Sequence, residues 1–339
     1  MPTDLRVLVI ELAFPGDAVL SIVLAEELKR LDPTLHISYL VRPDVVDLLR
    51  CAPSIDQVIP FDKRSTESGT EGIRKKASEL NEQEFDLIYV LHSSTRTLRL
   101  VSLLNATKKR FLQAFPEGAT TDKPLLRTEH LLTILKQDYP STELTTLPRL
   151  APPDIAASAW LNLLPDRFVA IAPGSMWQTK CWPVSKFAQV AKALVEKGIA
   201  VVLVGGPRDV EIGAEIAKGL PLELMRDLTG QTTLLEAASV IAAAQLLLAN
   251  DSAPVHIATS VRTYTIAIFG PTIPAFGFRP PPQFGDVVEL AGLWCRPCTS
   301  HGPDKCPIYT HDCMNLIDAE TVIARVAAKL AEQFTFGDS

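Results

Sequence analysis

The 339-residue chain lacks several features that would place it in other protein classes. No apolar run approaches the roughly 20 residues that a membrane-spanning helix needs, and the first residues lack the basic stretch of a signal peptide. Acidic residues outnumber basic ones by 39 to 33, so the broad basic excess typical of nucleic-acid-binding proteins is missing. The sequence also contains no short solenoid-type repeat. We therefore expect a cytoplasmic globular protein without a nucleic-acid partner.

Two further absences limit the classes of ligand that the chain is expected to bind. There is no G-x-G-x-x-G motif, which argues against the dinucleotide-binding fingerprint. No acid occurs between Asp86 and Glu117, whereas that interval holds five basic residues, namely Arg96, Arg99, Lys108, Lys109 and Arg110. A solvated helix face explains such a run. The alternative is an anion site for a phosphorylated acceptor or for a membrane surface.

Apolar runs alternate with helical patterns in both halves of the chain, which predicts parallel α/β sheets covered by helices on both faces. Strands are predicted at 6–12, 36–42, 57–61, 86–92, 167–172, 199–205, 246–251 and 263–270. Helical spacing predicts helices at 17–31, 185–198, 209–220, 234–245 and 318–334, the last of them capped by Asp318.

A stretch rich in proline and threonine at 139–154 is predicted to link two domains, 1–150 and 151–339. One hydrophobic core rarely serves 339 residues. The last helix is expected either to stay on the second domain or to pack back on the first. Open parallel sheets bind ligands beyond the carboxyl ends of their strands, so both domains are expected to offer loops to a cleft between them.

The stretch PGSMWQTKCWP at 173–183 carries polar groups that a plain turn does not need. Lys180 lies between Trp177 and Trp182, and Ser175 follows a Pro-Gly pair. A diphosphate leaving group gains negative charge as its bond to a sugar breaks. A fixed ammonium and hydroxyl would stabilise that charge. A surface stack of the lysine on the indoles is the alternative.

The stretch ANDSAPVHIATS at 249–260 places polar residues between a predicted strand and a helix. Helix N-termini offer unpaired N–H groups and a partial positive charge, which suit a diphosphate. Ser252 adds a hydroxyl there, and His256 would lie one turn further along the same face. We therefore predict that Asp251, Ser252 and His256 bind the donor, with a structural role as the alternative for the histidine.

Two more loops at predicted strand ends carry candidate residues. Asp17, in ELAFPGDAVLS at 11–21, is suited to take a proton from an attacking hydroxyl, although a plain helix cap is the alternative. Thr272, in IFGPT at 268–272, is a further hydrogen-bond donor, and an ordinary turn is the alternative there.

The six cysteines are expected to be thiols or metal ligands, because disulfides are rare in the cytosol. Four of them follow the spacing C-x₂-C-x₇-C-x₆-C, which is compatible with a tetrahedral structural zinc site: Cys295, Cys298, Cys306 and Cys313. Thiols without metal are the alternative. No pattern of histidine and glutamate for an open catalytic zinc site is evident.

Several motifs together resemble the ADP-heptose:lipopolysaccharide heptosyltransferase family. They are PGDAVLS, PGSMWQTKCWPVSKFAQVAKAL, ANDSAPVHIATS and IFGPT. The CRPC…C…C pattern and a stretch similar to HSSTRT also occur in many members. The resemblance extends from Val7 to about Leu330, and the combination of Lys-x-Trp-Pro with Asn-Asp-Ser…His is specific to this family.

The resemblance implies a GT-B architecture, in which two Rossmann-like domains face each other across a cleft. The first would bind the acceptor and the second the nucleotide-sugar donor. It also implies inverting transfer without a catalytic metal. Asp17 matches the family's proposed base. The donor-binding positions match Ser175, Lys180, Thr232, Asp251, Ser252 and His256.

Three residues depart from the family's usual pattern. Cys181 stands where an arginine usually precedes Trp-Pro, Ala253 replaces a glycine, and Glu11 replaces a commonly basic residue near the base. These departures are compatible with diphosphate chemistry, and they leave the identity of the sugar, the nucleotide and the acceptor open.

We therefore predict transfer of a heptose or related sugar from ADP-heptose to a lipopolysaccharide core or similar lipid-linked saccharide. Asp17 and Lys180 would be catalytic. Arg96 and Arg99 would contact acceptor phosphates, with peripheral contact to the inner face of the membrane. The alternatives are another nucleotide-sugar enzyme of the GT-B class, such as an epimerase or hydrolase, and a non-catalytic nucleotide-sugar-binding member.

Overall fold

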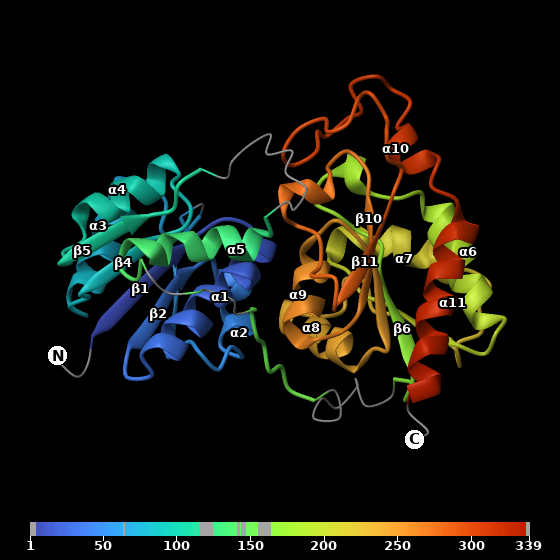
Figure 1. The fold of residues 1–339 in the computed structure, drawn as a ribbon, viewed down its shortest axis with the longest axis horizontal. Coiled ribbons are helices and arrows are strands. Elements are labelled where there is room, and N and C mark those ends of the chain that lie inside the picture. Colours follow the sequence, from blue (N-terminus) through green and yellow to red (C-terminus); the bar gives the residue numbers. More distant parts are fainter. Residues whose placement is uncertain are drawn as a thin grey trace. The chain divides into compact units, whose positions relative to one another are not determined.

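The computed structural model describes residues 5–63, 65–114, 125–140, 143, 147–154 and 164–336. The chain divides into two compact units, Met1–Ala151 and Pro152–Ser339 (Figure 1). Residues 141–142 and 144–146 of the predicted linker lie outside the described residues. None of the helices in the described part of the chain combines the length and the hydrophobicity needed to cross a bilayer.

The first unit is built on a five-stranded parallel sheet with strand order β3-β2-β1-β4-β5. Its strands are β1 (Arg6–Glu11), β2 (His36–Val41), β3 (Gln57–Pro60), β4 (Leu87–Val90) and β5 (Lys108–Phe111). Its helices are α1 (Pro15–Leu31), α2 (Val46–Leu49), α3 (Gly69–Asn81), α4 (Thr95–Leu103) and α5 (Arg127–Leu132).

Helices cover both faces of this sheet because its central strands are apolar on both sides. Leu8 and Ile10 of β1 pack with residues of α3 and α4 in one buried cluster. On the other face, the Tyr39 hydroxyl of β2 donates to the Ser21 carbonyl of α1 at 2.7 Å. A strand that is buried on both faces reads as a continuous apolar run, which is how β1 was predicted from the sequence.

The second unit contains a six-stranded parallel sheet with the order β11-β10-β9-β6-β7-β8. Its strands are β6 (Phe168–Ala172), β7 (Ala200–Leu203), β8 (Met225–Asp227), β9 (Leu246–Asn250), β10 (Thr265–Phe269) and β11 (Gly285–Glu289). Its helices are α6 (Val184–Val195), α7 (Val210–Ala217), α8 (Leu234–Ala243), α9 (Ala253–Val261), α10 (Asp312–Asn315) and α11 (Ala319–Phe336).

Helix α11 begins one residue after Asp318 and packs within the second unit (Figure 1). Its residues Val322, Val326 and Leu330 join the same buried cluster as residues of β6, β7 and α6. The helix therefore covers the sheet of its own unit.

The parallel topology divides the basic run that the sequence groups together. Arg96 and Arg99 lie in the first turns of α4, which starts just after β4 ends. Lys108 begins β5 and pairs with Leu87, the first residue of β4. It therefore lies at the amino ends of the strands, whereas α4 starts at their carboxyl ends. Arg110 is bound to Asp138 at 2.7 Å. The basic residues of this interval therefore do not all lie at one end of the sheet, and a role of Arg96 and Arg99 in binding an anionic acceptor stays a prediction.

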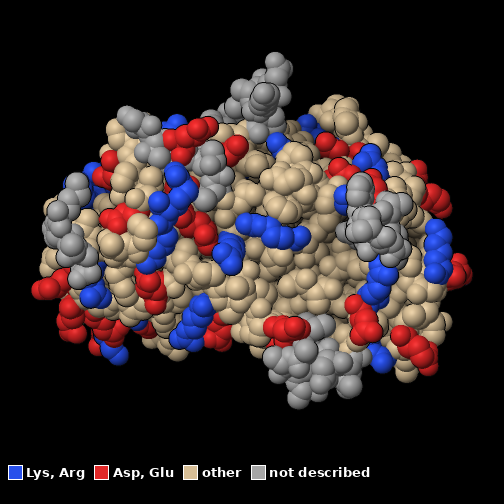
Figure 2. Space-filling model, turned by 60° about the horizontal axis from the view of Figure 1, so that its bottom comes forward, with Lys and Arg blue, Asp and Glu red and all other residues tan. Residues whose placement is uncertain are grey.

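Charges of both signs are mixed on the face of the protein that Figure 2 draws. Figure 2 shows lysine and arginine interspersed with aspartate and glutamate over the face drawn, without a broad basic area. This agrees with the excess of 39 acidic over 33 basic residues in the sequence.

Candidate functional site

Three residues from three loops meet at the carboxyl edge of the second sheet. The Lys180 ammonium lies 2.6 Å from Oδ2 of Asp251, which directly follows β9. The Thr272 hydroxyl, three residues beyond the end of β10, donates to the same oxygen at 2.7 Å. All three residues are buried. The sequence predicted each of them for the donor site, and the structure brings them together.

Asn250 explains why the 173–183 loop lies over this edge. Its side-chain oxygen accepts the Trp182 backbone N–H at 3.0 Å, and its amide nitrogen donates to the Pro173 carbonyl at 2.6 Å. One fully buried side chain at the end of β9 therefore holds both ends of the loop that carries Lys180. A buried polar group needs such partners, because leaving it unpaired costs about 1–3 kcal/mol.

The N-terminus of α9 lies beside this trio. Ser252 is the N-cap residue, but its hydroxyl donates to the Asn250 carbonyl at 3.2 Å and does not cap the helix. Within the described residues, no side chain accepts a hydrogen bond from a first-turn N–H group of α9, and the Val255 N–H donates to the Ser252 carbonyl at 3.1 Å. Ala253, which replaces the family's usual glycine, is the first helical residue, a position that suits alanine.

Ser175 lies in the same loop as Lys180. Its hydroxyl accepts the Trp177 backbone N–H at 3.4 Å, and it is half-buried. Cys181 follows the lysine, and burial raises the pKa of its thiol. A neutral thiol thus stands where the family usually has a cation, which leaves Lys180 as the positive charge of this loop.

The two tryptophans do not sandwich the lysine. Trp182 is buried, packs edge-on against Phe187 with ring centroids 5.0 Å apart, and donates its indole N–H to the Ile317 carbonyl at 3.2 Å. Because Lys180 is buried and bound to Asp251, the surface stack is wrong as well. Trp182 anchors the end of the loop in the core of the second unit.

Two further residues were predicted to bind the donor, His256 and Thr232. His256 is buried in α9, with its ring 5.9 Å from that of Phe278 and tilted by 46°. It does follow Ser252 by one helical turn, as predicted. Thr232 lies in the loop between β8 and α8, and β8 is three strands away from β9 in the sheet. Donor-binding roles for both remain predictions.

Asp17 is the third residue of α1 rather than its cap. The N-cap is Phe14, so the explanation of Asp17 as a plain N-cap is wrong. The carboxylate is half-buried, and it accepts no hydrogen bond within the described part of the chain. Its lone pairs are therefore available to a reacting group.

Glu11 is buried next to Asp17. Burial, and then the negative charge of Asp17, raise the pKa of Glu11 to about 8. The Ala13 backbone N–H donates to Glu11 Oε1 at 2.8 Å, and Lys63 and Arg127 exert a smaller opposing effect. The departure at position 11 therefore places a neutral carboxyl group beside Asp17 at neutral pH.

Replacing Glu11 with Gln is expected to raise stability more as the pH increases. A group with a raised folded-state pKa stabilises the fold fully below its ordinary pKa of 4.5, and this contribution is lost as the pH rises through about 8. Gln keeps the acceptor for Ala13 but does not ionise. We expect the difference in urea midpoint between Glu11→Gln and wild type to grow from pH 5 to pH 8.

Glu71→Gln, at an exposed position of α3, is the matched control and should show no such trend. Parallel stability curves for Glu11→Gln and wild type across this pH range would contradict the burial of a protonated Glu11.

Basic residues also meet the carboxyl edge of the first sheet. Arg96 is exposed and donates to the Lys63 carbonyl at 3.4 Å, and Arg99 is exposed one turn further on. Lys63 and Arg42 line a cavity of about 270 Å³ beside the ends of β2 and β3. Arg42 is already paired with Asp44 at 2.7 Å.

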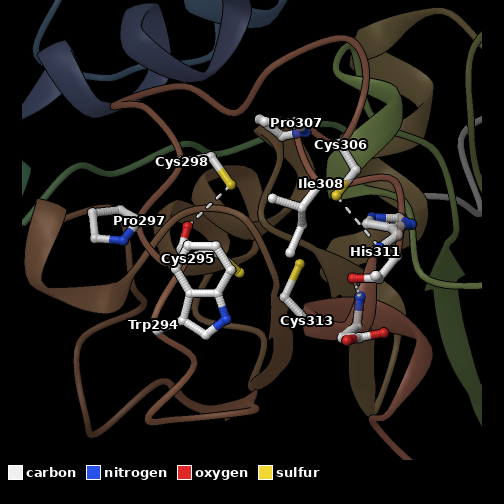
Figure 3. Close-up of a pocket in the computed structure, with 11 residues that line it drawn as sticks. Trp294, Cys295, Pro297, Cys298, Cys306, Pro307, Ile308, His311 and Cys313 are labelled. Carbon is white, nitrogen blue, oxygen red and sulfur yellow. Dashed lines mark hydrogen bonds between the residues drawn. The ribbon is translucent and has the colours of Figure 1, made fainter.

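The four late cysteines line one cavity of about 240 Å³ (Figure 3). Burial would raise the pKa of the Cys306 thiol, but backbone N–H groups from His311 and neighbouring residues lower it below its usual value. Such bonds favour a thiolate. As placed, however, no three His, Cys, Asp or Glu side chains within the described ranges are close enough to share a metal ion. The thiols alone do not form a coordination sphere in this arrangement.

Sequence reasoning missed several residues that shape the site. They are Asn250, Thr179, Arg296 and His311. The one local signal was a polar residue at the end of the buried strand β9. The other three residues have partners that are distant in the sequence. For example, the His311 ring lies 2.7 Å from the Thr179 carbonyl, although the two residues are 132 positions apart.

Comparison with known proteins identifies the relatives of this chain. The family model described as glycosyltransferase family 9 (heptosyltransferase) matches residues 73–303. Lipopolysaccharide heptosyltransferase 3 of Escherichia coli K12 is 27% identical over 347 residues, covering 96% of this chain and 98% of that protein. Lipopolysaccharide heptosyltransferase 2 of the same strain is 28% identical over 303 residues, covering 80% of this chain and 84% of that protein.

Solved structures agree with the predicted GT-B fold. A family 9 glycosyltransferase from Veillonella parvula has a TM-score of 0.82 at 23% identity, covering 98% of this chain and 99% of that one. Escherichia coli ADP-heptose lipopolysaccharide heptosyltransferase II has a TM-score of 0.79 at 23% identity, covering 97% and 99%. The predicted fold class and family are confirmed. The chain belongs to glycosyltransferase family 9, the heptosyltransferases, and is a glycosyltransferase.

Proposed function

We propose that this enzyme transfers a heptose from ADP-heptose to a saccharide of the lipopolysaccharide core, with inversion at the anomeric carbon. The observation that carries the proposal is the Lys180–Asp251–Thr272 trio beside the open N-terminus of α9. A buried ammonium with a fixed partner, next to helix amides, suits a diphosphate. Relatives named for heptosyl transfer support the choice of sugar.

In this proposal the second unit holds the donor. The diphosphate binds at the N-terminus of α9, where Ser252 offers its hydroxyl and Lys180 a positive charge. Asp251 and Thr272 do not need to touch the donor. Asp251 accepts hydrogen bonds from both Thr272 and Lys180, and this fixes the direction of the ammonium. A preorganised cation of this kind acts without waiting for solvent to reorganise.

The first unit supplies the base and the acceptor contacts. Asp17 takes the proton from an acceptor hydroxyl, whose oxygen then bonds to the anomeric carbon. The bond between that carbon and the diphosphate oxygen breaks, and its electron pair leaves with ADP. The charge that develops on ADP is balanced by Lys180. No metal ion takes part in any of these steps.

Arg96 and Arg99 are proposed to bind anionic groups of the acceptor at the inner face of the membrane. Both are exposed at the start of α4, where a phosphate could approach. The double charge reversal Arg96→Glu/Arg99→Glu is expected to raise the acceptor KM about tenfold or more and to leave ADP affinity unchanged. Lys108→Glu is the control from the opposite edge of the sheet. Equal losses for donor and acceptor would contradict this role.

We further propose that the four cysteines hold a structural zinc ion, separate from the reaction. The shared cavity and the amide bonds to Cys306 support this, but the thiols would have to move closer together to bind one ion. Elemental analysis of the purified protein provides the check. Less than about 0.1 zinc per chain, after purification without chelators, would contradict the proposal.

A donor screen tests the proposed function directly. ADP-, UDP-, GDP- and dTDP-sugars are incubated with the enzyme, with and without a lipopolysaccharide core acceptor, and nucleotide release and product are measured. We expect release of ADP from ADP-heptose only when acceptor is present, together with a heptosylated product. Acceptor-independent release would favour a hydrolase. Binding without release would favour a non-catalytic nucleotide-sugar-binding protein.

A further inference from the structure

The segment that carries the late cysteines also contacts two of the three loops that form the Lys180–Asp251–Thr272 trio, namely the loop at 173–183 and the loop after β10. We call residues 290–318 the cysteine segment. It follows the edge strand β11 and continues into α11. Its backbone binds the β10 loop, where the Cys298 N–H donates to the Pro271 carbonyl at 2.9 Å. It also binds the 173–183 loop, where the Pro303 carbonyl accepts the Thr179 hydroxyl.

Gly302 shows how closely the segment approaches both loops at once. A Cβ atom at this position would lie 3.2 Å from Pro271 Cγ, 3.3 Å from Thr179 Oγ1 and 3.4 Å from Lys180 Cγ. The residue also has a φ of +82°, a conformation that favours glycine. The cysteine segment therefore packs directly against the lysine of the trio.

Two side chains of the segment hold the residues on which the trio depends. His311 Nε2 lies 2.7 Å from the carbonyl of Thr179, the residue before Lys180. A carbonyl only accepts, so the ring nitrogen is the donor. Arg296 donates to the Thr272 carbonyl at 2.7 Å and is itself paired with Glu289 at 2.8 Å.

His311 also links these contacts to the cysteines. Its backbone N–H lies 3.4 Å from the Cys306 sulfur, while its ring holds Thr179 (Figure 3 shows the contact with Cys306). One residue thus connects the wall of the cysteine cavity to the loop that carries the ammonium. Thr179 and Thr272 are both buried, so their carbonyls cannot readily exchange these partners for water.

We propose that His311 and Arg296 are positioning residues, through which the cysteine segment sets the place of Lys180 and Thr272 in the donor site. This inference rests on the proposed role of Lys180 toward a nucleoside diphosphate. Small displacements of a charged group matter in such a site, because preorganisation depends on distances of about 3 Å.

A double-mutant cycle on ADP binding tests the proposal. Calorimetry with ADP compares wild type, His311→Ala, Lys180→Met and the double variant. Losing the ring contact is expected to weaken ADP binding about tenfold, the scale of one hydrogen bond. If His311 acts through Lys180, the double variant should bind no more weakly than Lys180→Met. A parallel cycle pairs Arg296→Met with Thr272→Val, where the same lack of additivity is expected.

Controls separate positioning from folding. His301→Ala removes an exposed histidine of the same segment and should bind ADP like wild type. His311→Gln retains an N–H donor and should restore part of the affinity, whereas His311→Phe keeps a ring without the donor and should not. These two variants also serve if His311→Ala does not fold.

Two results would overturn the inference while leaving the proposed function intact. One is wild-type ADP binding by both His311→Ala and His311→Phe. The other is full additivity of the His311 and Lys180 losses, which would mean that the histidine acts elsewhere. Unchanged ADP binding by Lys180→Met would instead overturn the proposed role of Lys180, and the inference with it.

Discussion

Replacing Lys180 with Met is expected to lower kcat/KM for the nucleotide-sugar donor by about 10²-fold or more. Lys180 carries the positive charge of its loop, since the neighbouring Cys181 supplies a neutral thiol where the family usually has a cation. Because the ammonium is fixed by Asp251 at 2.6 Å, its contribution to the developing charge on the diphosphate does not require reorganisation. Initial-rate kinetics with ADP-heptose and acceptor provide the measurement.

The main complication of this variant is that the buried Asp251 carboxylate loses its partner. Removing one partner of a buried ion pair costs about 3–5 kcal/mol, because the remaining charge is uncompensated. The double variant Lys180→Met/Asp251→Asn removes both charges. If the cation itself is needed, this variant should fold like wild type and be as inactive as Lys180→Met.

Lys192→Met is the matched control for this experiment. Lys192 lies on the exposed face of α6, with 68% of its side chain accessible and only a loose pair with Glu196. It should retain wild-type kinetics. Recovery of activity in the double variant would show that Lys180 matters only for stability, and would remove it from the mechanism.

Replacing Asp17 with Asn is expected to lower kcat by about 10²- to 10⁴-fold, the usual contribution of a general base. The side chain keeps its size, but an amide cannot accept the proton of the acceptor hydroxyl. Asp17 suits the role because its half-buried carboxylate accepts no hydrogen bond in the described part of the chain. ADP affinity should not change, since the donor is proposed to bind to the second unit.

Asp47→Asn is the control in the first unit. Asp47 is an exposed acid of α2, with 73% of its side chain accessible, and its loss should leave kcat unchanged. Near-normal turnover by Asp17→Asn on the true substrates would show that another group accepts the proton. Loss of ADP affinity in that variant would likewise contradict the division of roles between the two units.

The strands that were predicted from the sequence and the strands that were missed differ in hydrophobicity. The apolar runs at 6–12 and 167–172 became β1 and β6, because central strands bury both faces and need no polar side chains. The strands β5, β8 and β11 were not predicted. All three are edge strands that carry charged residues. Their pairing is decided by the neighbouring strand rather than by their own hydrophobicity.

The candidate site was predicted in part for a related reason. Carboxyl ends of parallel strands meet at one edge, so the sequence indicated that Lys180, Asp251 and Thr272 would gather there. It could not indicate that Asp251 is the partner of Lys180, because the two are 71 residues apart and no local spacing records the pairing. For the same reason the explanation that placed the lysine on tryptophan rings was wrong.

The sequence by itself determined the central strands, the two-unit organisation, the family and the loops that carry the candidate residues, because these follow from local hydrophobic patterns and short motifs. Only the tertiary structure decided which side chains bind each other. The division of the basic run by the first sheet, the hold of Asn250 on both ends of one loop, and the contact of His311 with Thr179 all join residues distant in sequence. Hydrogen bonds and ion pairs depend on distances of a few ångström in the folded chain, and those distances arise only when the strands have taken their order.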